Sequence, residues 1–204
     1  MGAGLESRKA AVFLDRDGVL NHERSFIVRP DDLVLMPGAA EAVRRLNISG
    51  REVVVVSNQS IVARGGCSEA DIVRVNDRLH VLLEEQGAHL DALYYCPHHP
   101  DPGPGGNAEF AIACECRKPG GGMVLRAMAE RNIDLSNSWM VGDTSSDMEM
   151  ARRLGLRSIL VGTGYGGKDG KYSVSPDRVA ADLADAVAII LGEGISVFPA
   201  GPMC

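Results

Sequence analysis

Short runs of hydrophobic residues alternate along the chain with segments whose hydrophobic residues recur at helical spacing. The run at 51–58, REVVVVSN, is rich in β-branched residues and is typical of a strand buried on both faces of a sheet. We expect strands at 9–15, 51–58, 90–96, 138–143 and 157–162. Helix-like patterns lie between and after them, at 37–47, 68–87, 121–132, 146–155 and 179–194.

This alternation predicts an α/β fold, a Rossmann-like three-layer sandwich with a central parallel sheet. The chain has 204 residues, no internal repeat and no linker, so we expect one domain over 1–194 without a large cap domain. The last ten residues, 195–204, are expected to form a flexible tail. The Pro- and Gly-rich segment at 97–107 interrupts the pattern, and long loops inside compact domains are often functional.

Polar residues end four of the predicted strands. They are Asp15, the pair Ser57 and Asn58, Cys96, and Asp143. Because ligands of open parallel sheets bind beyond the carboxyl ends of the strands, these side chains are expected to meet at one edge of the sheet.

The carboxylates among them predict a metal site. Asp15 and Asp17 flank the end of the first strand, Asp143 ends the fourth, and Asp147 follows four residues later. Acids gathered in one small volume repel each other unless a cation compensates, and oxygen ligands suit Mg²⁺. The alternative is structural: a turn carboxylate together with Asp147 as a helix cap.

A second cluster brackets the long loop. Cys96, His98 or His99, Cys114 and Cys116 supply the three sulfurs and one imidazole of a tetrahedral structural zinc site, which leaves no position for a catalytic water. Small packed thiols, or a disulfide, are the alternatives. The sequence therefore predicts a zinc-stapled loop over 96–116.

Charge and hydropathy narrow the function classes. The chain carries 27 acidic and 21 basic residues, a net charge of −6, which argues against a nucleic-acid partner. It has no apolar run of membrane-spanning length, and its first residues lack the apolar core of a signal peptide. We therefore expect a cytoplasmic protein without membrane contact, in which thiols stay reduced, and we expect a monomer.

Four short motifs occur in an order that resembles a known group of enzymes. DRDG (15–18), SNQS (57–60), RKP (117–119) and GDTSSD (142–147) resemble the haloacid-dehalogenase superfamily of phosphohydrolases. With CPHHP (96–100) and CECRKP (114–119) added, the chain is similar to the heptose bisphosphate phosphatases and the related histidinol-phosphate phosphatases.

The resemblance implies a Mg²⁺-dependent hydrolase that removes the 7-phosphate of D-glycero-D-manno-heptose 1,7-bisphosphate through an aspartyl-phosphate. It makes Asp15 the nucleophile and Asp17 the general acid and base. It places Mg²⁺ between Asp15, the main-chain carbonyl of Asp17 and Asp143. Lys118 is then the cation opposite the transferring phosphoryl group, and Asp147 holds Lys118 or a metal-bound water.

The same resemblance assigns the substrate contacts and the second metal. Ser57 and Asn58 would bind the phosphate under attack, while Arg64 and Arg117 would bind the second phosphate of a small phosphorylated sugar. It implies structural Zn²⁺ in the loop and favours His98 over His99 as its imidazole ligand.

Other functions remain open at this point. A histidinol-phosphate phosphatase or another small sugar-phosphate phosphatase is the enzymatic alternative, and a phospho-accepting receiver module is the non-enzymatic one. The segment GTGYGG (162–167) matches a dinucleotide-binding pattern but is not followed by a helix, so we expect a flexible loop near the substrate.

Overall fold

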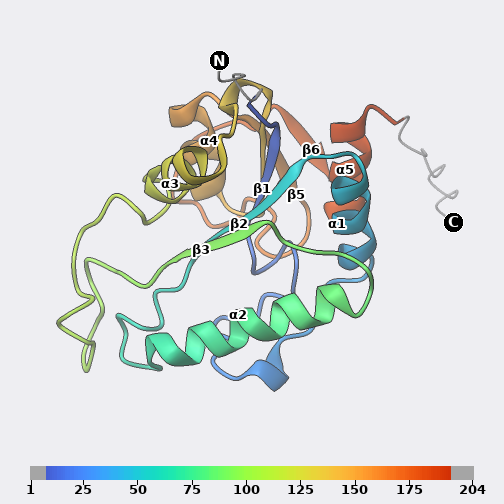
Figure 1. Cartoon of the computed structure of the whole chain (residues 1–204). Coiled ribbons are helices and arrows are strands. Elements are labelled where there is room, and N and C mark those ends of the chain that lie inside the picture. The colour runs from blue at the N-terminus through green and yellow to red at the C-terminus, as the bar shows by residue number, and fades with distance from the viewer. Residues whose placement is uncertain (1–7, 194–204) are drawn as a thin grey trace, which may run out of the picture.

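One all-parallel sheet of six strands organises the molecule (Figure 1), in the order β3-β2-β1-β4-β5-β6. The computed structural model describes residues 8–193, so the predicted tail at 195–204 lies outside the described residues. The strands are β1 Ala11–Leu14, β2 Glu52–Asn58, β3 Ala92–Cys96, β4 Trp139–Gly142, β5 Arg157–Val161 and β6 Arg178–Ala180. From β1 the chain first adds β2 and β3 on one side, and then adds β4, β5 and β6 on the other side, so β1 lies between β2 and β4. This is where a ligand crevice opens in such sheets.

Helices cover both faces of the sheet, as predicted for a three-layer sandwich. They are α1 Ala39–Ile48, α2 Glu69–Glu84, α3 Gly122–Arg131, α4 Ser145–Leu154 and α5 Leu183–Leu191, with short 3-10 turns at Pro30–Asp32 and Leu135–Asn137. Alternate strand residues serve the two faces. Val12 and Leu14 pack with α1, α2 and α5, whereas Ala11 and Phe13 pack with α3 and α4.

Local signals explain most helix boundaries. The Ser68 hydroxyl oxygen accepts a hydrogen bond from the Asp71 N–H, and the Ser68 N–H donates to Asp71 Oδ2, which together form a capping box at the start of α2. Gly155 and Gly192 end α4 and α5 in the left-handed conformation that glycine adopts without strain.

The predicted helix at 179–194 is wrong at its start. Arg178–Ala180 instead forms β6, paired in parallel with β5, and α5 begins only at Leu183. The side chain of Asp182 accepts a hydrogen bond from the main chain of Asp185 and caps the helix there. Strand pairing across the sheet edge, a long-range contact, therefore overrode the helical pattern of the preceding residues.

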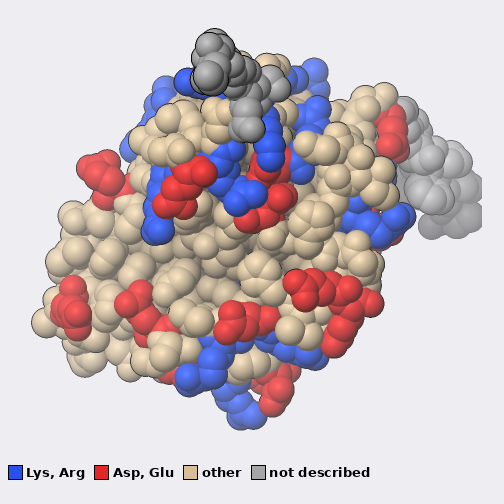
Figure 2. Space-filling view, viewed as in Figure 1, with Lys and Arg blue, Asp and Glu red and all other residues tan. Residues whose placement is uncertain are grey.

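Two long connections leave the sheet at its carboxyl edge, at 15–38 and 97–121, and the 3-10 turn at Pro30–Asp32 is the helical element that they contain. Within this range no helix is both long and apolar enough to cross a membrane. Figure 2 shows that basic side chains on one face lie among acidic ones, above and below a band without charged residues.

Candidate active site

Three of the four polar strand ends converge on one pocket as the sequence predicts, whereas Cys96, at the end of β3, lies in a separate cluster with His98, Cys114 and Cys116. Asp15, Ser57, Asn58 and Asp143 line one pocket with a volume of about 470 Å³ beyond the ends of β1, β2 and β4. Its walls also contain Asp17, Glu23, Ser25, Phe26, Gln59, Ser60, Arg64, His99, Arg117, Lys118, Thr144, Ser146, Tyr165 and Lys171. The pocket therefore joins residues from the whole carboxyl edge of the sheet.

A buried ion triad lies at the base of the pocket. Lys118 Nζ is 2.8 Å from Asp15 Oδ1 and 2.6 Å from Asp147 Oδ1, and all three side chains are almost fully buried. Burial opposes the charge of Lys118, but the two carboxylates outweigh it and raise the pKa of the ammonium. Burial also raises the pKa of Asp15 to about 7 against the opposing charge of Lys118.

Asp147 serves two purposes. Its Oδ2 accepts hydrogen bonds from the main chain and the hydroxyl of Thr144, which caps α4, while its Oδ1 faces Lys118. Asp147 therefore does take part in capping the helix, as the structural alternative proposed, and it also pairs with Lys118. The capping contacts fix the carboxylate so that its second oxygen reaches the ammonium of Lys118.

The Asp17 carboxylate is held by three side chains to which the sequence motifs assign no role of their own. It accepts hydrogen bonds from Arg16, from Asn21 Nδ2 and from Gln59 Nε2, the last two at 2.8 Å. Burial alone would raise its pKa, but the Arg16 charge and these donors outweigh burial and lower the pKa of Asp17. Arg16 is itself fully buried and donates to Asn76 on α2.

The two carboxylate oxygens of Asp143 differ in their hydrogen bonding. Oδ2 accepts a hydrogen bond from the Tyr165 main chain at 2.8 Å, whereas the buried Oδ1 has no hydrogen-bond partner among residues 8–193. Burial, followed by the charges of Asp15 and Asp147, raises the pKa of Asp143 to about 8. Oxygens of these three acids lie within 4.8 Å of one another, an arrangement that a hard cation would stabilise.

Basic groups gather at another part of the pocket wall. Arg64, His99, Arg117 and Lys171 all line it, and Arg64 Nη2 lies 3.5 Å from His99 Nε2. Burial, with the charges of Arg117 and Arg64, lowers the pKa of His99. The pocket thus offers cations both at its base and on its wall.

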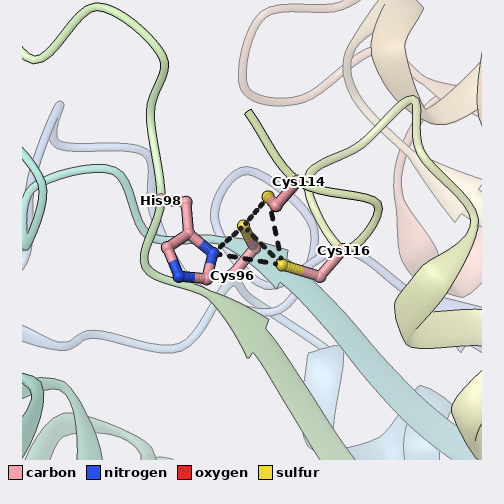
Figure 3. Close-up of side chains that lie close together, drawn as sticks. All are labelled: Cys96, His98, Cys114 and Cys116. Carbon is pink, nitrogen blue, oxygen red and sulfur yellow. Dashed lines mark hydrogen bonds between the residues drawn. The ribbon is translucent and has the colours of Figure 1, made fainter. Parts of the chain in front are cut away.

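Three cysteines and a histidine form a compact cluster next to the pocket (Figure 3). Cys116 Sγ lies 3.0 Å from Cys96 Sγ, 3.2 Å from Cys114 Sγ and 3.3 Å from His98 Nδ1. These separations exclude a disulfide, whose sulfurs are about 2.05 Å apart, and approach the edges of about 3.8 Å that Zn–S bonds give a tetrahedron. The donor set therefore fits zinc.

His99 does not belong to this cluster. Its Nδ1 accepts a hydrogen bond from the main chain of Asp101, and its Nε2 faces Arg64. Figure 3 shows His98 pointing toward the sulfurs, and of the two candidate histidines His98 is the one that belongs to the cluster.

The cysteine and histidine cluster is joined to the pocket through the chain that follows Cys116. Cys116 precedes Arg117 and Lys118, and Arg117 Nη1 donates to the main-chain carbonyl of His98 at 3.2 Å. Asn58, at the end of β2, binds the main chain of Lys118 through both atoms of its amide. The loop is thus fixed on both sides of the residues that enter the pocket.

Several pocket residues could not be found from the sequence. Gln59 and Ser60 lie inside the SNQS motif and Tyr165 inside GTGYGG, but Glu23, Phe26 and Lys171 carry no motif and come from loops. Burial, together with the charge of Asp17, raises the pKa of Glu23. The GTGYGG segment does lie beside the pocket, as expected, although only the structure shows that it contacts Asp143.

The fold and this site define a haloacid-dehalogenase-like hydrolase. The HAD-hydrolase-like family model matches residues 115–186. The chain is 46% identical over 184 residues to the D-glycero-D-manno-heptose-1,7-bisphosphate 7-phosphatase of Thermosynechococcus vestitus, covering 88% of this chain and 94% of that protein. It is 38% identical over 186 residues to the D-glycero-beta-D-manno-heptose-1,7-bisphosphate 7-phosphatase of Pasteurella multocida, covering 90% and 98%.

Solved structures agree with these relatives. The D,D-heptose 1,7-bisphosphate phosphatase of B. bronchiseptica, complexed with magnesium and phosphate, matches with a TM-score of 0.80 and 34% identity, over 91% of this chain and 99% of that one. The chain therefore belongs to the heptose bisphosphate phosphatase family of HAD-like hydrolases, enzymes that act on phosphate esters.

Proposed function

We propose that this chain is a Mg²⁺-dependent phosphatase that removes the 7-phosphate of D-glycero-D-manno-heptose 1,7-bisphosphate. The observation that carries the proposal is the pocket itself. Its base holds Asp15, Asp17 and Lys118, and its wall holds Arg64 and Arg117, so one phosphate can be cleaved while a second is bound. The names of the relatives at 38–46% identity support the same substrate.

Asp15 is the nucleophile in this proposal. Its Oδ1 accepts the Arg16 N–H at 2.7 Å and pairs with Lys118, so we assign attack to Oδ2. The Oδ2–phosphorus bond forms as the bond from phosphorus to the sugar oxygen breaks. Lys118 neutralises charge on the phosphoryl group, and Ser57 donates its hydroxyl to it.

Asp17 is the acid and then the base. The departing sugar oxygen takes the proton of the Asp17 carboxyl. Because Asp17 has a lowered pKa in the free protein, we infer that it acquires this proton when the negatively charged phosphate binds beside it. Afterwards the Asp17 carboxylate takes a proton from water, whose oxygen attacks phosphorus, and the bond to Asp15 breaks to release inorganic phosphate.

Two metal ions complete the proposal. Asp15, the main-chain carbonyl of Asp17 and Asp143 would hold Mg²⁺, which supplies neutralisation of charge on the phosphate oxygens. The unpartnered Oδ1 of Asp143 supports this assignment. Cys96, His98, Cys114 and Cys116 would hold Zn²⁺, which orders the loop before Arg117 and does no chemistry.

Residues 1–194 would act as a single phosphatase domain in the cytoplasm, and the protein would act as a monomer. Asn58 lines the pocket, and its side-chain amide also forms two hydrogen bonds with the main chain of Lys118. We therefore assign to Asn58 the positioning of Lys118 in addition to its contact with the phosphate.

A comparison of substrates tests the function. The purified protein with Mg²⁺ should hydrolyse heptose 1,7-bisphosphate with a higher kcat/KM than histidinol phosphate, and phosphorus NMR should identify heptose 1-phosphate as the product. A preference for histidinol phosphate would overturn the substrate assignment while leaving the phosphatase assignment intact.

A further inference from the structure

The loop 162–167 has the sequence GTGYGG, which matches a dinucleotide-binding pattern but is not followed by a helix. In the structure this loop wraps around the Asp143 carboxylate. The main-chain N–H of Tyr165 donates to Asp143 Oδ2 at 2.8 Å, and the N–H of Gly167 donates to the Asp143 carbonyl at 2.8 Å. The loop therefore holds both the side chain and the backbone of this residue.

The same loop also holds the segment that carries the two other acids of the site. Thr163 Oγ1 donates to the main-chain carbonyl of Gly18 at 2.6 Å. Gly18 follows Asp17 directly, and its φ of +80° is a conformation that glycine adopts freely. Thr163 thus ties the end of β5 to the turn after β1.

Two glycines allow this close approach. A Cβ on Gly164 would lie 2.1 Å from Asp143 Oδ2 and 2.8 Å from the Gly18 Cα, and a Cβ on Gly18 would lie 2.3 Å from Asp143 Oδ2. The carboxylate is therefore enclosed between two backbones. No side chain other than hydrogen fits at either position without moving Asp143.

This enclosure selects one orientation of the carboxylate. Asp143 is 1% exposed, its Oδ2 is fixed by the loop, and its Oδ1 has no hydrogen-bond partner in the described part of the chain. A buried unpartnered oxygen is costly unless a ligand satisfies it. The loop therefore leaves a single carboxylate oxygen available for a cation.

We infer that Thr163, Gly164 and Tyr165 are positioning residues for the divalent cation, holding Asp143 against the 15–18 turn so that the acids of the two strands form one site. This inference rests on the magnesium site of the proposed function. Removal of a residue that orients a metal ligand typically lowers metal affinity by about 10- to 100-fold.

Binding of Mn²⁺, followed by the electron paramagnetic resonance signal of the free ion, tests the inference without reference to activity. Thr163→Val should weaken Mn²⁺ binding by about 10-fold or more, and Thr163→Ser, which keeps the hydroxyl, should restore it. Unchanged binding in Thr163→Val would overturn the role of Thr163.

A matched pair of glycine variants separates the enclosure from backbone strain. Gly164 and Gly170 have φ values of +58° and +64°, but a Cβ on Gly170 has no atom within 4 Å. Gly164→Ala should therefore abolish Mn²⁺ binding, whereas Gly170→Ala should bind as the unmodified protein does. Equal effects of the two variants would show that strain alone is responsible, and would overturn the inference.

Asp143→Asn distinguishes this inference from the function on which it rests. Loss of Mn²⁺ binding in Asp143→Asn, with normal binding in Thr163→Val and Gly164→Ala, would refute only the role of the loop. Normal binding in Asp143→Asn would instead refute the metal site. Melting temperatures measured in chelator should show that each variant is folded.

Discussion

The side-chain amide of Asn58 is bound to the main chain of Lys118 by two hydrogen bonds. Asn58 Nδ2 donates to the Lys118 carbonyl at 3.2 Å, and Asn58 Oδ1 accepts the Lys118 N–H at 3.0 Å. The end of β2 thereby determines where the backbone of the lysine lies, and the lysine in turn pairs with Asp15 and Asp147.

Replacement of Asn58 by alanine should lower both stability and activity. Loss of the two hydrogen bonds should reduce the free energy of unfolding by about 1–3 kcal/mol, and misplacement of Lys118 should reduce kcat by roughly 100-fold. Asn47 offers a matched control, because its amide binds the main chain of His89 in the same way, remote from the pocket. Asn47→Ala should lower stability in urea while kcat stays unchanged.

Lys118→Met should remove the cation between two buried carboxylates. Breaking a buried pair in this way typically costs about 3–5 kcal/mol, and protonation of Asp15, whose pKa is already about 7, should reduce the loss at low pH. The double variant Lys118→Met/Asp147→Asn should regain part of the stability, as measured by urea unfolding, but no activity. Recovery of activity would contradict the role of Lys118.

The protein without metal should lose stability as the pH rises. Because the pKa of Asp143 is raised from 3.8 to about 8, the folded state holds this proton more tightly than the unfolded chain does. Its contribution is complete below about pH 4 and is lost as the pH approaches 8. In chelator, the free energy of unfolding should fall across this window.

Excess Mg²⁺ should oppose that fall, because the metal needs the carboxylate form. The gain in melting temperature should therefore be larger at about pH 8 than at about pH 6. Asp143→Asn should abolish the difference, and Asp177→Asn, which changes a carboxylate just before β6 outside the pocket, should preserve it.

The zinc ligands should act on activity through the loop. Cys116→Ser should lower the zinc content from one ion per chain, measured by mass spectrometry, increase proteolysis within 97–121, and reduce kcat. Cys67→Ser is the matched control, since Cys67 is a free cysteine outside the cluster. Full activity in a demonstrably zinc-free Cys116→Ser protein would refute the ordering role.

Arg64 should matter only for a substrate with a second phosphate. Loss of one charged hydrogen-bonding partner, about 1.5–3 kcal/mol, should raise KM for heptose 1,7-bisphosphate by roughly 10- to 100-fold. In Arg64→Ala, KM for heptose 7-phosphate should hardly change. Arg64→Lys keeps the positive charge and should raise KM for the bisphosphate less than Arg64→Ala does. Arg78→Ala, a change at a partly exposed position of α2 outside the pocket, should alter neither KM. An equal loss on both substrates would place Arg64 at the reacting phosphate instead.

The sequence by itself determined five of the six strands in residues 8–193 and the polar residues that end four of them. Buried β-branched runs are local signals, so Asp15, Ser57 and Asp143 could be placed at strand ends, and parallel strands bring their ends to one edge. The spacing of Cys96, Cys114 and Cys116 similarly predicted a cluster, which the structure contains, while zinc in that cluster stays a prediction. The strand ends could be placed because they depend on the pattern of burial within a few residues.

Only the tertiary structure decided how these groups meet. Strand β6 depends on pairing with β5, the contact of Asn58 with Lys118 spans 60 residues, and that of Tyr165 with Asp143 spans 22. Such contacts form where separate loops pack against each other at the end of the sheet. Sequence patterns report which face of an element is buried, but they carry little information about which distant residue fills the space beside it.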